Sequence, residues 1–528
     1  MRNILLFYLS ILILFSTDVV GQALSISGKV SADDGSILPG VSIAIKGTNQ
    51  GTTTNGEGTY SLDASPNSTL IFSFIGFQTL EVPVNNRSIV DVTLKNDVSQ
   101  LQEVVVTALG IKRDSRALGY SVAQVDGATL IQKSEPDPLK ALQGRVAGVD
   151  IRTSQGTPGA ATKIQIRGNT SFFGSNEPLI VVDGIPYNNT SVTTSSQTSG
   201  GGAYSNGLSS LDPNDIASMN ILKGAAAAAL YGSRASNGAI IITTKSGSSS
   251  PGKKGLEVTY NGSYASERIA NLPDYQNTYG TGSTFAYSNV NGSWGSRFDS
   301  QDSVAVWGDY LKAFPSLFPA SGKIAYKAVP DNVKDLFRTG HVWDNSVSIA
   351  GGNEKSSVSA TMSYLKQSGY VPNSGFNRGS IGLGGSTKLT NGLIASGNFS
   401  YSNTNQSGSV FGENQVDGAT SSFARNLFLG RNWDIAGLPY EDVRGFPVST
   451  SSAQYDNPFW AWKHNTVNTE NNRVTGNISL AYDITSWLST SYRIGVNQFN
   501  LFRREVVDIG SRGSGGLGNI KEANYSNK

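Results

Sequence analysis

From residue 255 onward, apolar and small polar side chains alternate along segments of about ten residues. In LEVTYNGSY, Leu256, Val258, Tyr260 and Tyr264 occupy one set of alternate positions, and polar residues occupy most of the other. The same pattern recurs in VSATMSY, VTGNISLAYD and LSTSYRIGVNQ. Successive side chains of a strand point to opposite faces. The pattern therefore predicts strands with one apolar and one polar face, as in membrane β-barrels.

The links between these segments favour a barrel over a soluble sandwich. Short and long links alternate strictly, which places the long ones at one end of the sheet, as in up-and-down membrane barrels. A Greek-key sandwich has no such requirement. The predicted strands are 255–267, 342–350, 355–366, 376–388, 391–403, 472–484 and 487–500.

The N-terminus predicts a secretory signal peptide over residues 1–21. Arg2 precedes the apolar run Ile4 to Phe15, and small residues follow near Gly21. The run is shorter than the ~18 residues of a spanning helix. No later run reaches that length, so we expect no transmembrane helix in the mature chain, which would enter a membrane only as a closed barrel.

Composition excludes several classes of site. The chain has no cysteine and only two histidines, His341 and His464, far apart in the sequence. Thiolate chemistry is excluded, and a histidine zinc site or Ser/His/Asp triad is disfavoured. The formal charge is +2 with no basic block, so we expect no nucleic-acid partner. No paired carboxylates stand out, and we expect neither an enzyme nor a cofactor.

Residues 24–96 predict a small β-sandwich. Short β-prone runs such as VSIAIKG and TLIFSFIGF are separated by turn sequences such as DDGS and TNGEG.

Residues 115–247 predict an α+β domain. DPLKALQGRVAG (Asp137–Gly148) has apolar residues at helical spacing, and LDPNDIASMNILKG begins with Asp212 as a helix N-cap followed by Pro213. We expect a third, closely packed helix in LKGAAAAALYG. Between these segments, KIQIRG, PLIVVDGIPY and GAIIITTKSG read as strands.

The linker 97–114 contains a β-prone patch, LQEVVVTALG, between two polar stretches. An unpaired apolar strand invites pairing with another chain. We expect the patch either to lie in a sheet or to serve a partner.

The order of these segments resembles the SusC/RagA-type TonB-dependent outer-membrane transporters. The resemblance rests on EVVVTALG, on ALQGRVAGVDIRTSQGTPGAATKIQIRG, on EPLIVVDGIPY and on ILKGAAAAALYGSRASNGAIIITTKSG. It implies a carboxypeptidase-regulatory-like sandwich at 24–96, an α+β plug at 115–247, and the first strands of an antiparallel barrel in the outer membrane at 255–528. The barrels of such transporters have about 22 strands around a plugged lumen.

The resemblance also implies partners. A SusD-like surface lipoprotein and an oligosaccharide or peptide ligand would lie outside, lipid would surround the barrel, and the C-terminal domain of TonB would act from the periplasm, where the N-terminal domain lies. Glu103, Val104, Val105, Val106 and Thr107 resemble the strand that TonB pairs with, the TonB box; strand addition gains its affinity from main-chain hydrogen bonds.

Weaker candidates come from the plug and the long loops. Arg145, Arg167 and Arg234 are candidates for ion pairs between plug and barrel wall, with ordinary structural or solvated arginines as the alternative. Phe172, Phe173, Tyr187 and Tyr204 are candidates for facing substrate. Aromatic rings of the long loops would either stack on sugars or stabilise the loops; these rings are Tyr275, Trp294, Trp307, Phe459, Trp460 and Trp462.

Seven strands, with an eighth predicted near Arg503 to Ile509, are too few to close such a barrel, and the chain ends in the polar sequence NIKEANYSNK. We therefore expect a truncated transporter that cannot transport as it stands. Two alternatives remain: a secreted glycan-binding β-sandwich adhesin, and a TonB-linked sensor.

Overall fold

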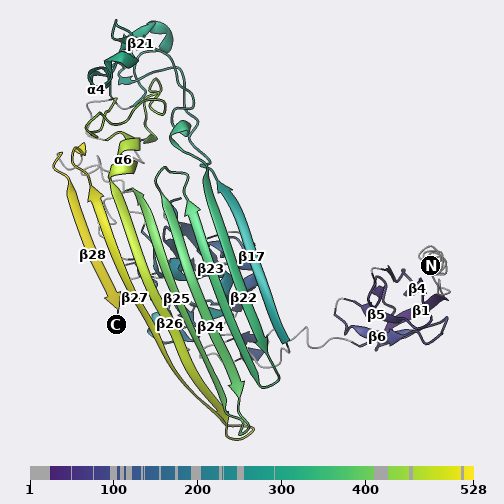
Figure 1. The fold of residues 1–528 in the computed structure, drawn as a ribbon. Helices are drawn as coiled ribbons and strands as arrows, with labels where there is room; N and C mark the ends of the chain where they lie inside the picture. Colours follow the sequence, from purple (N-terminus) through teal and green to yellow (C-terminus); the bar gives the residue numbers. More distant parts are fainter. Residues whose placement is uncertain are drawn as a thin grey trace, which may run out of the picture. The chain divides into compact units, whose positions relative to one another are not determined.

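The computed structural model describes the chain as two compact units, divided near residues 104–117. The ribbon in Figure 1 is coloured along the sequence. The described residues are 24–48, 50–74, 76–95, 104–106, 112–114, 122–132, 135, 137–153, 156–169, 171–172, 176–191, 204–224, 227, 229, 231–245, 255–290, 292–409, 426–450, 456–512 and 516–527. The predicted signal peptide lies outside them. No helix among them is long and apolar enough to cross a membrane.

The first unit contains the predicted β-sandwich. One sheet has the order β4-β1-β7, from Thr59–Ala64, Leu24–Ala32 and Val92–Leu94. The other has the order β3-β2-β5-β6, from Gly51–Thr53, Ser42–Ile45, Thr69–Ser73 and Leu80–Pro83. A single buried core of aliphatic and aromatic side chains includes Ile26, Ile43 and Phe72.

In the second unit, residues 122–245 form an α+β domain that we call the plug. Its central sheet has the order β10-β15-β16-β13-β14, from Val122–Asp126, Ile216–Leu222, Ala239–Thr244, Leu179–Val182 and Ile185–Pro186. A separate antiparallel pair is formed by β11 (Val149–Thr153) and β12 (Thr162–Ile166). The helix α2 (Gly127–Leu130) follows β10, and the buried core lies between these elements.

Two of the predicted plug helices are much shorter in the structure than the sequence predicts. Within Asp137–Gly148 only a 3-10 turn, Lys140–Leu142, forms. After Asp212, whose Oδ1 accepts a hydrogen bond from the Asn214 backbone N–H at 2.9 Å, the helix is the single turn Pro213–Asp215. The chain then enters β15, which is paired on both sides, so tertiary pairing overrides the helical start signal. Of the third predicted helix, the described residues Ala227, Ala229 and Tyr231 are helical.

The remaining chain forms one unclosed antiparallel sheet of eight strands, which we call the wall (Figure 1). Each strand pairs with its neighbours in sequence, as the prediction of an up-and-down sheet requires. The strands are β17 (Gly255–Glu267), β22 (Gly340–Gly352), β23 (Ser356–Ser368), β24 (Gly375–Lys388), β25 (Ile394–Ser409), β26 (Thr466–Asp483), β27 (Ser489–Val507) and β28 (Asn519–Asn527).

The predicted eighth strand is misplaced. Residues 503–507 continue β27, and the eighth strand is β28, in the sequence that reads as a polar tail. Links 353–355, 389–393 and 484–488 lie at one end of the wall, whereas 268–339, 369–374, 410–465 and 508–518 lie at the other (Figure 1).

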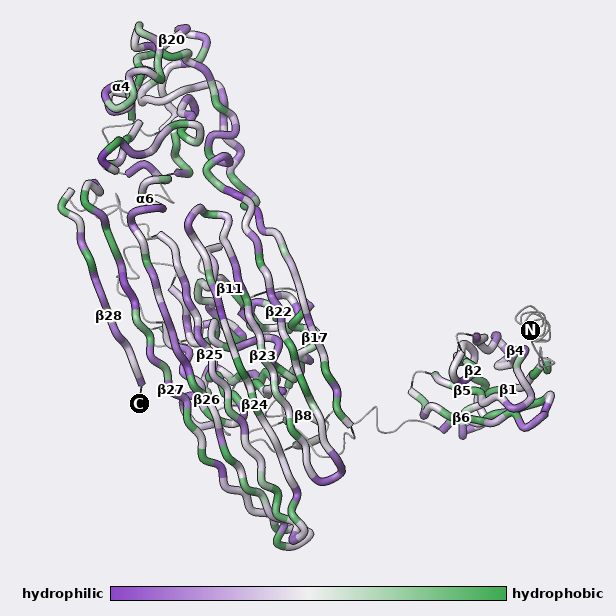
Figure 2. Tube along the Cα trace, in the orientation of Figure 1, coloured by the Kyte–Doolittle hydropathy of each residue, from purple (hydrophilic) through white to green (hydrophobic). Residues whose placement is uncertain are grey.

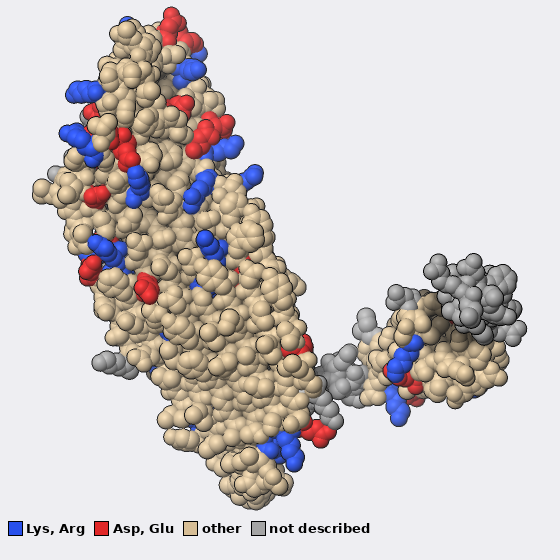
Figure 3. Space-filling model, in the orientation of Figure 1, with Lys and Arg blue, Asp and Glu red and all other residues tan. Residues whose placement is uncertain are grey.

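The two faces of the wall differ as the alternation predicts. On β17, Leu256 is 74% exposed and Tyr260 is 67% exposed on the outer face. On β23, Val358 and Met362 are also exposed outward, whereas Ser359, Thr361 and Ser363 are buried against the plug. Figure 2 shows hydrophobic and hydrophilic residues alternating along these strands. Figure 3 shows a broad stretch of the outer face with almost no charged residues and charges gathering towards the long links. The outer face therefore suits an apolar environment, and the inner face suits a polar partner.

Candidate functional site

The predicted TonB-pairing strand lies only partly within the described residues. Val104–Val106 forms the short strand β8, which pairs with β9 (Lys112–Asp114) in a two-stranded sheet. Glu103 and Thr107 lie outside the described residues. Within the part of the chain that the structure describes, β9 is the strand that pairs with β8.

The plug contacts the wall through buried polar groups, first at the end of β13. Asp183 has a positive φ of 48° and directs its carboxylate back along the plug sheet, where it accepts from the N–H and the hydroxyl of Thr244. Its Oδ2 also accepts from the Asn398 side chain of β25 at 2.7 Å. Asn477 of β26 donates to the Asp183 carbonyl. One turn of the plug is thereby fixed to two wall strands.

A second contact holds the 3-10 turn that follows Asp212. The fully buried Arg378 of β24 donates to the Leu211 carbonyl at 2.9 Å and lies 3.5 Å from Asp212 Oδ1. Ser380 donates to Asp212 Oδ2, and the Asn214 amide bridges Asp212 to Asp344 of β22. A buried guanidinium needs hydrogen-bond acceptors, and the Ser209 and Leu211 carbonyls accept from Arg378 Nη1.

Asp215 lies in the same turn, facing the wall where β24 has Gly382. A Cβ on Gly382 would stand 2.7 Å from Asp215 Oδ2, so the glycine makes room for the carboxyl group. Burial, reinforced by the nearby Asp212 and Asp183 carboxylates, raises the pKa of Asp215 well above its usual value. The interface therefore favours the protonated form of this group.

Tyr187 and Tyr204, predicted to face substrate, are instead buried against the wall. Tyr187 donates to the Gly207 carbonyl within the plug, and the Arg473 guanidinium lies 4.2 Å from its ring centroid. Tyr204 donates to Glu505 Oε1 at 2.6 Å, with the Arg503 guanidinium 3.8 Å from its ring centroid. In these positions both rings attach the plug to β26 and β27.

The other weak candidates lie away from this interface. Arg145, Arg167 and Arg234 are exposed, and no ion pair among the described residues joins them to the wall. Buried cations at the interface come instead from wall strands and include Arg378, Arg473 and Arg503. Phe172 is 93% exposed on the plug surface, and Phe173 lies outside the described residues.

The plug segment Gly156–Ala160 touches the link between β23 and β24. Gly159 has φ +69°, and a Cβ there would stand 2.3 Å from the Phe376 ring. A Cβ on Gly156 would likewise overlap the Tyr370 hydroxyl, and the Pro158 carbonyl accepts from the Gln406 side chain. The glycines of this segment therefore permit close approach of plug backbone to the wall.

The two longest links fold together into a cap with its own core. Trp307 from link 268–339 packs against Trp433 and other apolar residues of link 410–465. The buried Arg431 donates to the carbonyls of Gln276 and Pro330 and to the side chains of Asn277 and Asn332. Since Trp307, Trp460 and Trp462 are buried, these predicted loop aromatics stabilise the cap.

Other loop aromatics remain exposed. Phe285 is 66% exposed at the turn between β18 (Gly282–Ser283) and β19 (Ala286–Tyr287), and Trp294 is 64% exposed beside it. The two rings meet edge to face, with centroids 6.3 Å apart. Thr284 and Phe285 both have positive φ, a turn conformation that favours asparagine and glycine. Of the predicted loop rings, Trp294 is therefore accessible to a ligand.

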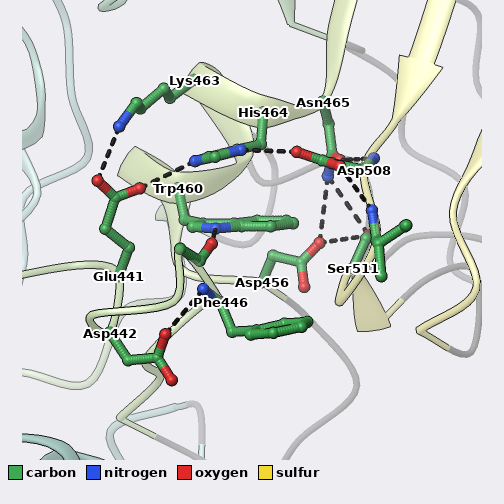
Figure 4. Close-up of polar contacts among 12 residues, drawn as sticks. Glu441, Asp442, Phe446, Asp456, Trp460, Lys463, His464, Asn465, Asp508 and Ser511 are labelled. Atoms are coloured by element: carbon green, nitrogen blue, oxygen red, sulfur yellow. Dashed lines mark hydrogen bonds and ion pairs between the residues drawn. The ribbon is translucent and has the colours of Figure 1, made fainter.

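A polar cluster fixes link 410–465 to link 508–518 (Figure 4). His464 ends the helix α6 (Pro458–His464), and its ring lies flat on Trp460, with centroids 4.7 Å apart. Its Nε2 is 2.9 Å from Glu441 Oε2, and its Nδ1 is 2.7 Å from Asp508 Oδ2. Lys463 forms a 2.7 Å ion pair with Glu441. The hydrogen bonds from Lys463 and then His464 lower the pKa of Glu441.

Beside this cluster, the buried carboxylate of Asp456 holds link 508–518 directly. It accepts from the Ser511 hydroxyl at 2.6 Å, the Arg512 backbone N–H at 2.9 Å and the Asn465 side chain at 3.2 Å (Figure 4). Burial raises the pKa of Asp456.

Two cavities in the described part of the chain differ in size and lining. A space of about 10 Å³ between plug and wall is lined by Asp183, Tyr187 and Asn477 and has room for about one water. A larger apolar groove of about 510 Å³ lies on the outer face between Tyr260, Met362 and Tyr401. No group of three or more potential metal ligands occurs among the described residues.

Comparisons with known proteins match this architecture. The domain family described as CarboxypepD_reg-like domain matches residues 26–106, and the TonB-dependent Receptor Plug Domain matches residues 114–239. The chain is 33% identical over 367 residues to the TonB-dependent receptor SusC of Bacteroides thetaiotaomicron, covering 69% of this chain and 32% of that protein. It is 34% identical over 373 residues to the TonB-dependent receptor P39 of Formosa agariphila, covering 69% of this chain and 31% of that protein.

Solved structures agree in fold. The RagAB peptide importer in its 'open-open' state aligns with a TM-score of 0.61 at 24% identity, covering 80% of this chain and 45% of that chain. A further structure of the RagAB peptide transporter aligns with a TM-score of 0.57 at 21% identity, covering 78% and 44%. The chain thus spans about a third of the length of the curated relatives that it matches.

Proposed function

Because this chain belongs to the SusC/RagA-type TonB-dependent receptors, we propose that it is part of an importer that takes a large nutrient across the outer membrane. The observation that carries the proposal is the difference between the two faces of the wall, which is apolar outside and polar inside. The plug lies against the polar face and is joined to it by buried hydrogen bonds. An apolar exterior suits lipid, and a plugged lumen suits gated passage.

The energy for import would come through TonB. In this proposal a TonB strand pairs with β8, and Glu103 to Thr107 supply the main-chain groups. A pull on this strand would reach the plug through β9 and β10, which follow it in the chain. The plug contacts at Asp183, Arg378 and Tyr204 would then be the bonds that have to break or shift.

The proposed partner outside is a SusD-like surface lipoprotein, and the proposed cargo is an oligosaccharide or a peptide. The relative named SusC and the structures described as RagAB peptide importers support such a system. Trp294 and Phe285, exposed on the cap, are candidates for contact with cargo or partner. The proposal includes no catalytic step.

Two other functions have less support. A secreted adhesin would not need a wall whose outer face is apolar from β17 into β27. A TonB-linked sensor would have a signalling domain with helices ahead of the plug, whereas described residues 24–95 form two β-sheets without a helix.

Binding to TonB tests the energy-coupling part of the proposal. A peptide of residues 97–114 should bind the C-terminal domain of TonB, as measured by titration calorimetry, and Val105→Pro should abolish binding because proline removes a main-chain donor. Val105→Thr, which keeps the backbone and β-propensity, is the matched control and should bind. Equal binding by the proline variant would refute strand pairing at this site.

A further inference from the structure

The contacts of His464 require a charged ring. Both ring nitrogens lie within 2.9 Å of a carboxylate oxygen, Nε2 beside Glu441 and Nδ1 beside Asp508 (Figure 4). An ionised carboxylate only accepts hydrogen bonds, so each nitrogen has to donate. A neutral imidazole carries one N–H, whereas the imidazolium carries two. Two hydrogen bonds donated by the ring at once are therefore possible only in the imidazolium form.

Loss of the ring proton leaves one of these contacts unfavourable. Whichever nitrogen keeps its proton, the other presents a lone pair to a carboxylate oxygen at 2.7 or 2.9 Å. The side chain of His464 is only 20% exposed, so water cannot readily replace the lost bond. Imidazoles ordinarily change charge between roughly pH 5 and 8.

We propose that His464 is a pH-dependent clasp, which holds the cap to the β27–β28 link while the ring is charged and releases it when the ring becomes neutral. Glu441 and α6 belong to link 410–465, which contributes to the cap core, whereas Asp508 belongs to the neighbouring link. Trp460 supports the ring by stacking and donates its own N–H to the Gly445 carbonyl. The ring is thus fixed in the orientation in which it bridges the two links.

The charges around the clasp favour the closed state at low pH. The ring faces two carboxylates, whereas Lys463 forms its ion pair with Glu441, so a positive ring would balance the charge of Asp508. The other charged groups on the packed elements are already engaged: Asp442 with Arg444, Asp456 with Ser511 and the Arg512 N–H, Arg512 with Asp309, and Arg504 with Glu522.

Asp456 provides a second attachment between the two links. Its hydrogen bonds to Ser511 and to the Arg512 N–H join the same two links without His464. Opening of the His464 contact would therefore loosen the link around Asp508 without detaching it. Such a device would make the mobility of the cap depend on external pH. This proposal does not depend on whether the chain takes part in import.

A distance measurement tests the proposal directly. The chain has no cysteine, so spin labels can be placed at Val443→Cys and Leu517→Cys, which are 97% and 84% exposed on the two links. Pulsed electron resonance on the full chain in detergent would give the distance distribution at about pH 5.5 and about pH 8.5, which bracket the ordinary imidazole range. We expect one narrow distribution at the lower pH. The open population should rise about tenfold at the higher pH, because hydrogen bonds to a charged group are lost.

Three variants make the result specific to His464. His464→Gln should show the open population at both pH values, and Asp508→Asn should remove the pH step because an amide accommodates the neutral ring. His341→Gln is the matched control, since this other histidine contacts Tyr264 and forms no ion pair within the described part of the chain, and it should retain the step. A wild-type distribution that does not change with pH, or a step that persists in His464→Gln, would overturn the proposal.

Discussion

The hydroxyl of Tyr204 on the plug donates a 2.6 Å hydrogen bond to Glu505 of β27, although 301 residues separate the two in sequence. The Arg503 guanidinium covers the same tyrosine ring, and all three groups are buried. The contact shows how the plug is held: its side chains reach polar and charged groups on the inner face of the wall.

Removal of this hydroxyl should loosen the plug from the wall. We expect Tyr204→Phe to reduce the free energy of unfolding by about 1–3 kcal/mol, because a hydrogen bond to a buried carboxylate is lost. Tyr60→Phe is the control, since its hydroxyl bonds to the Val90 carbonyl within the N-terminal β-sandwich. Limited proteolysis should cleave the plug faster in Tyr204→Phe while β26 and β27 stay protected. Equal protection of the plug in Tyr204→Phe and wild type would contradict this role.

Loss of Arg378 should be more severe. Arg378→Met keeps much of the side-chain volume but leaves Asp212 without its buried cation, and removing one partner of a buried pair costs about 3–5 kcal/mol. The double variant Arg378→Met with Asp212→Asn should recover a large part of that loss. Thermal unfolding of the wild type, the two single variants and the double variant measures the coupling energy between Arg378 and Asp212. Additive effects of the two single substitutions would show that the pair is not coupled.

Asp215 should make the stability of the plug and wall depend on pH. Its folded pKa is raised by burial, so its contribution to stability is fully present below its unfolded pKa and is lost as pH rises through the folded value. Asp215→Asn should therefore leave stability at about pH 4 nearly unchanged and raise it by roughly 1 kcal/mol or more at about pH 8. Unfolding midpoints across this range provide the check; a variant that follows the wild-type pH profile would exclude Asp215 as the source.

Gly159 should tolerate no side chain. Alanine there combines a positive φ with a 2.3 Å overlap on the Phe376 ring. Gly168→Ala is the control, because Gly168 has φ +85° and a Cβ added to it would meet nothing within 4 Å, so it isolates the backbone cost of about 1 kcal/mol. We expect Gly159→Ala to cost about 1–3 kcal/mol more in unfolding experiments, and Phe376→Leu to relieve part of it. Equal effects of the two alanines would mean that the plug segment moves away freely.

The fold was largely predictable where one physical constraint dominates. Alternation identified β17 to β26 because each has an apolar outer face and small polar inner residues. The pattern fails towards the end of β27: Gln498 and Asn500 point outward, whereas Phe499 and Leu501 point inward. The alternation therefore stops in the sequence before the strand ends in the structure, and β28, with Lys521 and Glu522 exposed, lacks the apolar pattern entirely.

The plug was harder to predict because tertiary contacts decide its local structure. IASMNIL follows an N-cap and a proline, which signal a helix, yet it is a strand because β10 and β16 flank it. The site residues were missed for a related reason. Arg378, Arg473 and Arg503 occupy ordinary polar positions of alternating strands, and only the filling of the inner face by the plug makes them buried partners.

Uptake tests the central claim most directly. In a full-length version of the receptor, deletion of Gln102–Thr107 should abolish nutrient uptake while leaving binding of the nutrient at the cell surface unchanged, since the wall, plug contacts and cap are intact. Replacement of the same residues by a glycine and serine sequence of equal length should have the same effect, which separates loss of the strand from shortening of the linker. Undiminished uptake after removal of Gln102–Thr107 would contradict an importer driven through this strand.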